Sequence, residues 1–366
     1  MAGNDRLRAL SEHGVSIWLD DLSRERIATG ALAAAVRDKH VAGVTTNPTI
    51  FRNAVVRGTS AYAAQLRELA RQGVGAAVAV ERLTTTDVRD AADVLRPVYE
   101  RTDGRDGRVS IEVDPGLAHD TACTVKQARR LWETIDRPNV LIKVPATPAG
   151  LPAITDLVAH GISVNVTLIF ALSRYAAVHA AYMEGVEQAI ELGADPAQVR
   201  SVASFFVSRL DTYADRRLDA IGTGEARRLR GLAGLANARL AHRRHVRDLE
   251  SGRWRALAAA GAHRQRLLWT STSVKDPAYP DTYYTAGLAI PGTVNTLPES
   301  AIDAFADHGT VGGAVPEEAG VFRALADLGI GYDEMVRRLE ADGIAQFLTS
   351  WRDLLDAVER YLSEEK

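Results

Sequence analysis

Eight short apolar stretches alternate along this chain with helical patterns, and this alternation restricts the possible folds more than any other feature. Each stretch is rich in Val, Ile, Leu or Phe, as expected of strands buried in a parallel sheet. Eight strand–helix units indicate a (β/α)8 TIM barrel rather than an open doubly wound sheet. No Gly-x-Gly-x-x-Gly pattern follows the first stretch, which argues against a dinucleotide-binding fold. The predicted strands cover residues 15–20, 41–48, 108–115, 139–147, 161–170, 201–209, 266–271 and 292–298.

Helical patterns fill the intervals between these strands. A helix is expected to begin at a Ser23 cap, and a longer helical region is expected to contain an internal start at Thr86 and Asp87. We interpret residues 1–366 as one domain, with a barrel core at about 15–310 and C-terminal helices at about 311–366. The predicted helices lie at 23–39, 59–101, 121–136, 148–160, 173–192 and, as an addition to the barrel, 212–260.

Composition excludes several classes of protein. The 44 basic and 47 acidic residues leave a net charge of −3, so no global positive field favours nucleic acid or an anionic membrane. The single cysteine, Cys123, permits neither an intramolecular disulfide nor a cysteine-based metal cluster. The first residues lack the apolar core of a signal peptide, and no run is long enough to span a membrane. We therefore expect a cytoplasmic protein.

The basic run at residues 239–247 is a local exception to this charge balance. Its arginines alternate with apolar residues, which is typical of a solvated helix face. A nucleic-acid site would need an aromatic platform or a wider basic surface.

Lys143 lies in the middle of the fourth predicted strand, between Ile142 and Val144. Desolvation favours the uncharged form of a lysine, and a free amine can form a Schiff base with a carbonyl substrate. An edge-strand lysine whose amine reaches water is the alternative on this stretch alone.

Polar residues near the ends of the other strands favour the functional interpretation of Lys143 over the edge-strand interpretation. In a (β/α)8 barrel the C-terminal strand ends form one mouth, where active sites lie. A barrel interior that served only stability would carry Val, Ile or Leu at these positions. We therefore predict that Lys143 is functional and shares the mouth with Asp20, Asn47, Glu112, Asn165, Thr167, Ser204, Arg209, Ser271 and Lys275.

Two motifs resemble the signatures of the transaldolase family. Residues 43–51 (GVTTNPTIF) resemble its N-terminal signature, and residues 140–147 (VLIKVPAT) resemble its active-site signature around the Schiff-base lysine. The chain length and the segment 212–260 are similar to the longer bacterial form. Further segments follow in the family's order, namely 110–114 (SIEVD), 165–167 (NVT), 201–209 (SVASFFVSR) and 268–271 (LWTS).

The resemblance implies a class I aldolase barrel that transfers a dihydroxyacetone unit between sugar phosphates in the non-oxidative pentose phosphate pathway, with neither metal nor organic cofactor. It implies that Lys143 forms the Schiff base and that Asp20 is the base for carbon–carbon cleavage. It assigns to Glu112 and Thr167 a water that transfers protons. It also implies that the dihydroxyacetone unit contacts Asn47, Asn165 and Ser204.

The phosphate end departs from the better-known shorter form of the family. Arg209 and Ser271 match the phosphate-binding arginine and serine, but Ser273 stands where that form has a second arginine. We expect Lys275 to replace it, although an ammonium binds phosphate as a point charge and not as a bidentate fork.

Structural interpretations of the same residues stay open at this point. Asp20 could cap a helix, Asn47 could be a turn residue before proline, and Asn165 could be a satisfied core amide. Arg209 could pair with Asp211 or Asp215 on the following helix.

Four functions compete. The leading hypothesis is a transaldolase that acts on sugar phosphates as a monomer or homodimer. A related fructose-6-phosphate aldolase would release free dihydroxyacetone, but those relatives are much shorter. A barrel that serves as a scaffold would be expected to lack Lys143, Asp20 or Glu112, and a nucleic-acid-binding role would rest on 239–247 alone.

Overall fold

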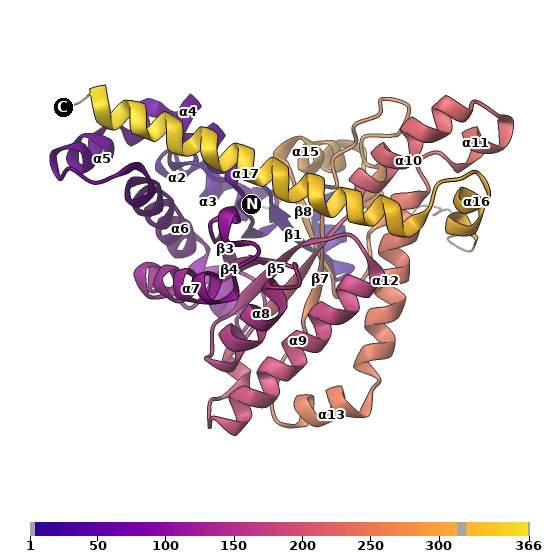
Figure 1. The fold of residues 1–366 in the computed structure, drawn as a ribbon, viewed down its shortest axis with the longest axis horizontal. Helices are drawn as coiled ribbons and strands as arrows, with labels where there is room; N and C mark the ends of the chain where they lie inside the picture. Colours follow the sequence, from indigo (N-terminus) through magenta and orange to yellow (C-terminus); the bar gives the residue numbers. More distant parts are fainter. Residues whose placement is uncertain (1–3, 313–319, 365–366) are drawn as a thin grey trace.

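The computed structural model describes residues 4–312 and 320–364, and these contain a closed barrel of eight parallel strands (Figure 1). The strands follow one another around the barrel in chain order, and the eighth pairs with the first. The predicted (β/α)8 fold is confirmed. The strands are β1 (Ser16–Leu19), β2 (Val41–Val44), β3 (Arg108–Glu112), β4 (Val140–Pro145), β5 (Val164–Ile169), β6 (Ser201–Phe206), β7 (Arg266–Thr270) and β8 (Val294–Leu297).

Helices surround the barrel because each buries one apolar face against the strands. The pairs α8–α9 and α7–α8 pack side by side, as consecutive strand–helix units require. This outer layer contains α4 (Pro48–Arg57), α5 (Thr59–Arg71), α6 (Ala76–Arg101), α7 (Thr121–Ile135), α8 (Gly150–Ala159), α9 (Leu172–Glu191), α10 (Ser208–Ile221), α12 (Ala233–Leu249), α14 (Tyr283–Gly287) and α15 (Glu299–His308). Shorter or peripheral elements are α1 (Asp5–Glu12), α11 (Gly224–Leu229), α13 (Gly252–Ala259), α16 (Val321–Asp327) and the 3-10 turns η1 (Pro115–Leu117) and η2 (Pro196–Gln198).

The helix predicted at 23–39 is two helices, α2 (Arg24–Ala28) and α3 (Ala31–Asp38). Gly30 separates them with a φ of 76°, a backbone conformation that favours glycine. The predicted cap at its start is confirmed, since the Ser23 hydroxyl accepts a hydrogen bond from the Arg26 amide at 3.2 Å.

The internal helix start predicted at Thr86 and Asp87 is wrong, because both residues lie inside α6. The Thr86 hydroxyl donates to the carbonyl of Arg82 at 2.7 Å, so its polar side chain is satisfied within the helix. The break in the region 59–101 lies instead between α5 and α6, where Gly73 has a φ of 67°.

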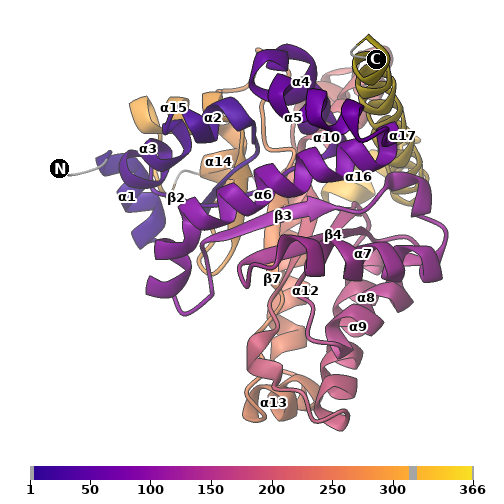
Figure 2. The ribbon, with the colours of Figure 1, turned by 90° about the vertical axis from the view of Figure 1, so that its left-hand side faces the viewer.

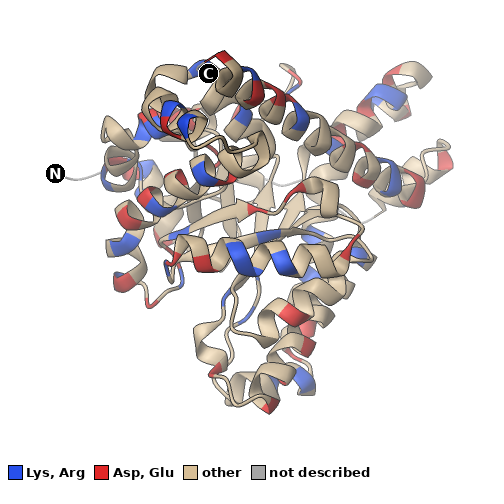
Figure 3. Ribbon diagram, turned by 60° about the vertical axis from the view of Figure 1, so that its left-hand side comes forward, with Lys and Arg blue, Asp and Glu red and all other residues tan. Residues whose placement is uncertain are grey.

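The basic run at 239–247 lies on α12, one face of which is buried against the barrel. Arg244 pairs with Asp248 one turn further on, at 2.7 Å. In the view of Figure 3, basic and acidic residues are interspersed over the outer helices. These observations agree with a solvated helix face.

The long C-terminal helix α17 (Tyr332–Glu364) crosses the end of the barrel (Figure 1). Figure 2 shows β3 pointing toward α17, so the helix lies over the C-terminal ends of the strands. Its 33 residues span about 50 Å at 1.5 Å per residue. Along this length α17 contacts α4, α5, α6, α10 and β5. The single-domain interpretation stays a prediction, and these contacts support it.

No helix in the described part of the chain is both long and apolar enough to cross a membrane.

Candidate active site

Lys143 lies at the centre of the C-terminal mouth and is only 5% exposed. Its neighbours Ile142 and Val144 are fully buried, as the sequence suggested. Its Nζ donates a hydrogen bond to the carbonyl oxygen of Thr46 at 3.0 Å. It lies 3.8 Å from Oε2 of Glu112, which is its direct partner in the pairing of β3 with β4. The interpretation of Lys143 as an edge-strand lysine in water is therefore wrong.

Glu112 is a buried acid whose proton affinity suits neutral pH. Burial raises its pKa from the usual 4.5 to about 7, with the charge of Lys143 acting against this shift and that of Asp20 adding to it. Neither carboxylate oxygen has a hydrogen-bond partner among the described residues. Glu112 can therefore give or take a proton near pH 7 beside the lysine amine.

Asp20 follows β1 and faces the same lysine. Its Oδ1 accepts a hydrogen bond from the Thr45 hydroxyl at 2.8 Å. Burial raises the pKa of Asp20, whereas the charge of Lys143 lowers it. Ser23, and not Asp20, caps the next helix, so the capping interpretation of Asp20 is wrong. Thr45, which orients the carboxylate, was not singled out from the sequence.

Asn165 and Ser204 belong to a buried hydrogen-bonded chain. Ser204 Oγ donates to Asn165 Oδ1 at 2.7 Å, and Asn165 Nδ2 donates to Ser110 Oγ at 2.9 Å. These bonds fix the orientation of the amide and leave one of its N–H groups for another acceptor. The amide is thus held as a core amide would be, and its contact with substrate stays a prediction.

Thr167 lies on β5 next to an irregularity in the strand. The pairing of β5 with β6 shifts between Val166 and Ile169, and Leu168 has a φ of 61°. Such a conformation is costly for a branched side chain and is found mainly at functional sites. The Thr167 hydroxyl is buried without a hydrogen-bond partner among the described residues, as are both oxygens of Glu112. Because buried polar groups normally have partners, these atoms are available to a substrate or a water.

Asn47 has a local structural role. Its Oδ1 accepts the backbone N–H of Ile50 at 3.0 Å and so caps α4, with Pro48 at the first helical position. Only the side-chain amide N–H groups remain for a ligand, and the predicted contact with substrate is not tested.

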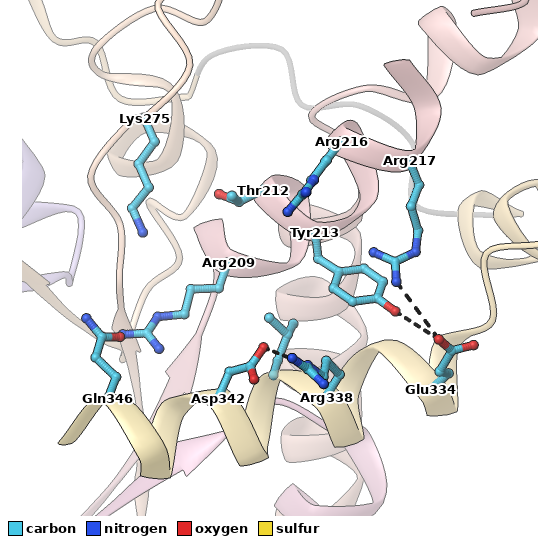
Figure 4. Close-up of a pocket in the computed structure, with 11 residues that line it drawn as sticks. Arg209, Thr212, Tyr213, Arg216, Arg217, Lys275, Glu334, Arg338, Asp342 and Gln346 are labelled. Atoms are coloured by element: carbon cyan, nitrogen blue, oxygen red, sulfur yellow. Dashed lines mark hydrogen bonds and ion pairs between the residues drawn. The ribbon is translucent and has the colours of Figure 1, made fainter. Parts of the chain in front are cut away.

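The predicted phosphate residues Arg209 and Lys275 line a cavity of about 540 Å³ between α10 and α17 (Figure 4). Burial lowers the pKa of both side chains, and the charge of Arg209 lowers that of Lys275 further although this lysine is partly exposed to solvent. Arg216 points into the same cavity, whereas Arg217 and Arg338 pair with acidic residues. The cavity therefore concentrates positive charge.

Arg209 does not pair with the acids of its own helix. Asp211 accepts hydrogen bonds from the Gly234 amide and the Tyr284 hydroxyl, and Asp215 is held in the same way by Gly231 and Tyr279. The pairing alternative for Arg209 is wrong.

Ser271 follows β7 with a φ of 55°. Its hydroxyl lies 3.1 Å from that of Ser208, at the start of α10, and its carbonyl accepts the Ser208 amide. Ser271 therefore joins the end of β7 to the helix that carries Arg209.

The part of the site that sequence reasoning missed comes from α17. The ring centroid of Phe347 lies 5.7 Å from Lys143 Nζ, and Phe347 is 4% exposed. Gly343 allows this close approach, since a Cβ there would lie 2.9 Å from Leu168 and 3.7 Å from Arg209. The amphipathic pattern of α17 predicts a buried face but does not tell which part of the barrel it covers.

The described residues thus form a closed (β/α)8 barrel of the aldolase type, with a buried lysine and two carboxylates at its C-terminal mouth. No group of three or more potential metal-binding side chains occurs in residues 4–312 and 320–364.

The chain belongs to the Transaldolase/Fructose-6-phosphate aldolase family, whose model matches residues 17–358. It is 55% identical to Transaldolase 1 of Streptomyces avermitilis over 97% of this chain and 95% of that protein. It is 54% identical to the transaldolase of Acidothermus cellulolyticus, over 99% of this chain and 98% of the relative. The transaldolase of Thermobifida fusca is also 54% identical, and 98% of each chain is covered.

Proposed function

We propose that this chain is a transaldolase, a transferase that moves a dihydroxyacetone unit from sedoheptulose 7-phosphate or fructose 6-phosphate to glyceraldehyde 3-phosphate or erythrose 4-phosphate. The observation that carries the proposal is the position of Lys143, 3.8 Å from a glutamate with a pKa of about 7. Full-length relatives named transaldolase, at 53–55% identity, support the transfer reaction.

The reaction begins when the free amine of Lys143 adds to the ketone carbon of the donor sugar. Loss of water from this adduct requires a proton on the leaving hydroxyl, which Glu112 supplies directly or through a water. The product is a Schiff base in which the protonated imine can accept an electron pair.

Carbon–carbon cleavage follows when Asp20 removes the proton from the hydroxyl on the far carbon of the bond that breaks, which is the carbon that becomes the aldehyde of the leaving aldose. The bonding electrons pass into the imine and form an enamine, and the aldose phosphate leaves with a new carbonyl group. Thr45 holds the Asp20 carboxylate for this step. The enamine then attacks the aldehyde carbon of the acceptor aldose, whose carbonyl oxygen takes the proton from Asp20. Water hydrolyses the resulting imine, which releases the new ketose phosphate and frees Lys143.

The three-carbon intermediate must stay bound between the two half-reactions. The free N–H of Asn165, the Ser204 hydroxyl and the Asn47 amide are the groups we assign to its hydroxyls. Phe347 and α17 cover Lys143 and exclude water from the enamine.

We assign the phosphate to the cavity of Figure 4, where Arg209 and Lys275 would hold it. We assign the Ser271 hydroxyl, beside Ser208 at the start of α10, to the same phosphate. The position of Lys275 beside Arg209 supports its replacement of the second arginine. Arg216, at the same cavity, is a further cation that the phosphate can reach.

The cytoplasmic location, the pentose phosphate pathway, the absence of a cofactor, and the monomeric or homodimeric state belong to the same proposal.

The direct test is a coupled assay of fructose 6-phosphate with and without erythrose 4-phosphate. We expect sedoheptulose 7-phosphate to form rapidly with the acceptor. Without the acceptor, free dihydroxyacetone should form at least about 100-fold more slowly, a ratio that corresponds to about 2–3 kcal/mol. Release of dihydroxyacetone as fast as transfer would instead assign the aldolase activity. The Lys143→Met variant should be inactive in both assays.

A further inference from the structure

A second cavity, of about 250 Å³, lies at the opposite end of the barrel from Lys143. The first residues of three strands line it, namely Arg108 of β3, Ser201 of β6 and Arg266 of β7. The remaining polar lining comes from the loops that lead into these strands. We call this space the N-terminal cavity; the loops contribute Thr102, Asp103, Arg105, Arg200, His263 and Arg264.

The N-terminal cavity carries more positive than negative charge. Five arginines line it, whereas the nearby acids are Asp103, Asp106 and Asp195. Asp106 is already shared between Arg266 and Arg105. Among residues 4–312 and 320–364, no carboxylate forms an ion pair with the other three arginines, which are Arg108, Arg200 and Arg264.

Arg108 is the most deeply placed of these three cations, at 2% exposure. Its Nε donates to the carbonyl of Gly104 at 2.7 Å, and its guanidinium lies 5.2 Å from the ring centroid of Tyr99. Its Nη1 has no hydrogen-bond partner in the described part of the chain. A buried guanidinium N–H without an acceptor is costly, so the protein itself does not fully satisfy Arg108.

Arg266 provides the comparison within the same cavity. It is 7% exposed, yet it donates to Asp106 at 3.0 Å, to the Ser16 hydroxyl at 2.6 Å and to the Thr293 carbonyl at 3.0 Å. A structural arginine in this place is thus satisfied by the protein itself. Among the described residues, no carboxylate lies within ion-pair distance of Arg108, although the charge of Asp106 acts on it from further away.

Arg200 lies on the rim and uses only backbone acceptors. Its guanidinium donates to the carbonyls of Ala197 and Asp103, and the carboxylates of Asp103 and Asp195 act on its charge only from beyond ion-pair distance. Burial lowers the pKa of Arg108 and the positive charge of Arg200 lowers it further, whereas Tyr99 and Asp106 act in the opposite direction. Burial and Arg200 lower the pKa of His263 in the same way, so the cations of the cavity repel one another.

We propose that the N-terminal cavity binds a small phosphate-bearing anion, held by the guanidinium groups of Arg108, Arg200 and Arg264. Guanidinium groups match phosphate oxygens in charge and in the geometry of their paired N–H donors. The volume is slightly below that of common ligand pockets, which limits the ligand to a compact phosphate compound such as inorganic pyrophosphate or a short phosphate ester. This site is separate from the phosphate end at Arg209 and Lys275, and it does not depend on the proposed reaction.

Isothermal titration calorimetry with inorganic pyrophosphate tests the site. The titrated protein carries Arg209→Gln, Arg216→Gln and Lys275→Gln, which removes the cations that we assign to the other phosphate site. Adding Arg200→Gln and Arg264→Gln removes two rim guanidinium groups that are not fully buried, so the fold should persist by circular dichroism. The matched control is Arg255→Gln, an exposed arginine of α13 that does not line the cavity.

We expect saturable binding at one site per chain in the control, and at least about tenfold weaker binding in the Arg200→Gln/Arg264→Gln protein, because charge-assisted hydrogen bonds are lost. Equal affinity in the two proteins, or no saturable binding in the control, would overturn the proposal.

His263 provides a local readout of the same binding event. The charged groups around it are Arg200, Arg108, Asp103 and Asp195. A bound anion should raise its pKa in an NMR titration of the control protein, with the His263 signal assigned from a His263→Asn variant. Pyrophosphate that binds without moving this pKa would lie elsewhere and would contradict the assignment.

Discussion

Replacement of Glu112 by glutamine tests the electrostatics of the site through the stability of the protein. The folded structure raises the pKa of Glu112 from 4.5 to about 7, mainly by burial. A carboxyl whose pKa is raised on folding binds protons more strongly in the folded state. Its contribution to stability is therefore fully present below pH 4.5 and is lost as the pH rises to about 7.

The size of this pH-dependent loss follows from the shift. At about 1.4 kcal/mol per pKa unit, a rise from 4.5 to about 7 corresponds to about 3 kcal/mol. Glutamine has nearly the same shape and does not ionise. Between pH 4.5 and pH 8, the wild type should therefore lose about 3 kcal/mol of unfolding free energy relative to the Glu112→Gln variant.

Urea denaturation at several pH values measures this difference in stability. Glu299 provides a control, because its pKa is shifted in the opposite direction. Hydrogen bonds from Arg26 and Lys39 lower the pKa of Glu299 from 4.5 to about 2. The Glu299→Gln variant should thus lose stability relative to the wild type at neutral pH, and that deficit should disappear as the pH falls from about 4.5 to 2. We also expect Glu112→Gln to lower kcat by about 10² to 10⁴.

A constant stability difference between Glu112→Gln and the wild type from pH 4.5 to pH 8 would refute the assignment of a raised pKa. An unchanged kcat would refute its role in proton transfer.

Three further predictions concern α17 and the phosphate end. Phe347→Ala should lower the free energy of unfolding by about 3 kcal/mol, as for other buried phenylalanines, and should raise the rate at which water discharges the enamine, measured as dihydroxyacetone release. Gly343→Val should make the amides of α17 exchange faster while the barrel amides stay protected, because the new side chain meets Leu168; equal protection in both proteins would contradict the close contact. Lys275→Gln should raise KM for the sugar phosphate about tenfold with little change in kcat, whereas the exposed-helix control Lys126→Gln should leave both unchanged.

The barrel could be predicted because its strands and helices have different and regular patterns. Strands such as β4 and β5 are apolar on both faces, and the interruptions of that pattern, Lys143 and Asn165, mark the site. Asp20, Glu112 and Lys143 could be brought together from the sequence alone, since strand ends in this fold share one mouth.

The remaining features depend on contacts between segments far apart in the chain. The cap formed by Asn47 competes with its predicted role in substrate binding, and an Asn-Pro pair is compatible with both. The irregularity at Leu168 leaves no mark in an otherwise ordinary strand sequence. The position of Phe347 depends on where α17 packs, which its periodicity does not specify.

Borohydride reduction in the presence of fructose 6-phosphate, followed by peptide mass mapping, tests the central claim most directly. The chain has five lysines, at positions 39, 126, 143, 275 and 366, so each can be examined. We predict a reduced three-carbon adduct on Lys143 and on no other lysine. An adduct on a different lysine, or none on Lys143 under conditions of turnover, would contradict Schiff-base catalysis by this residue.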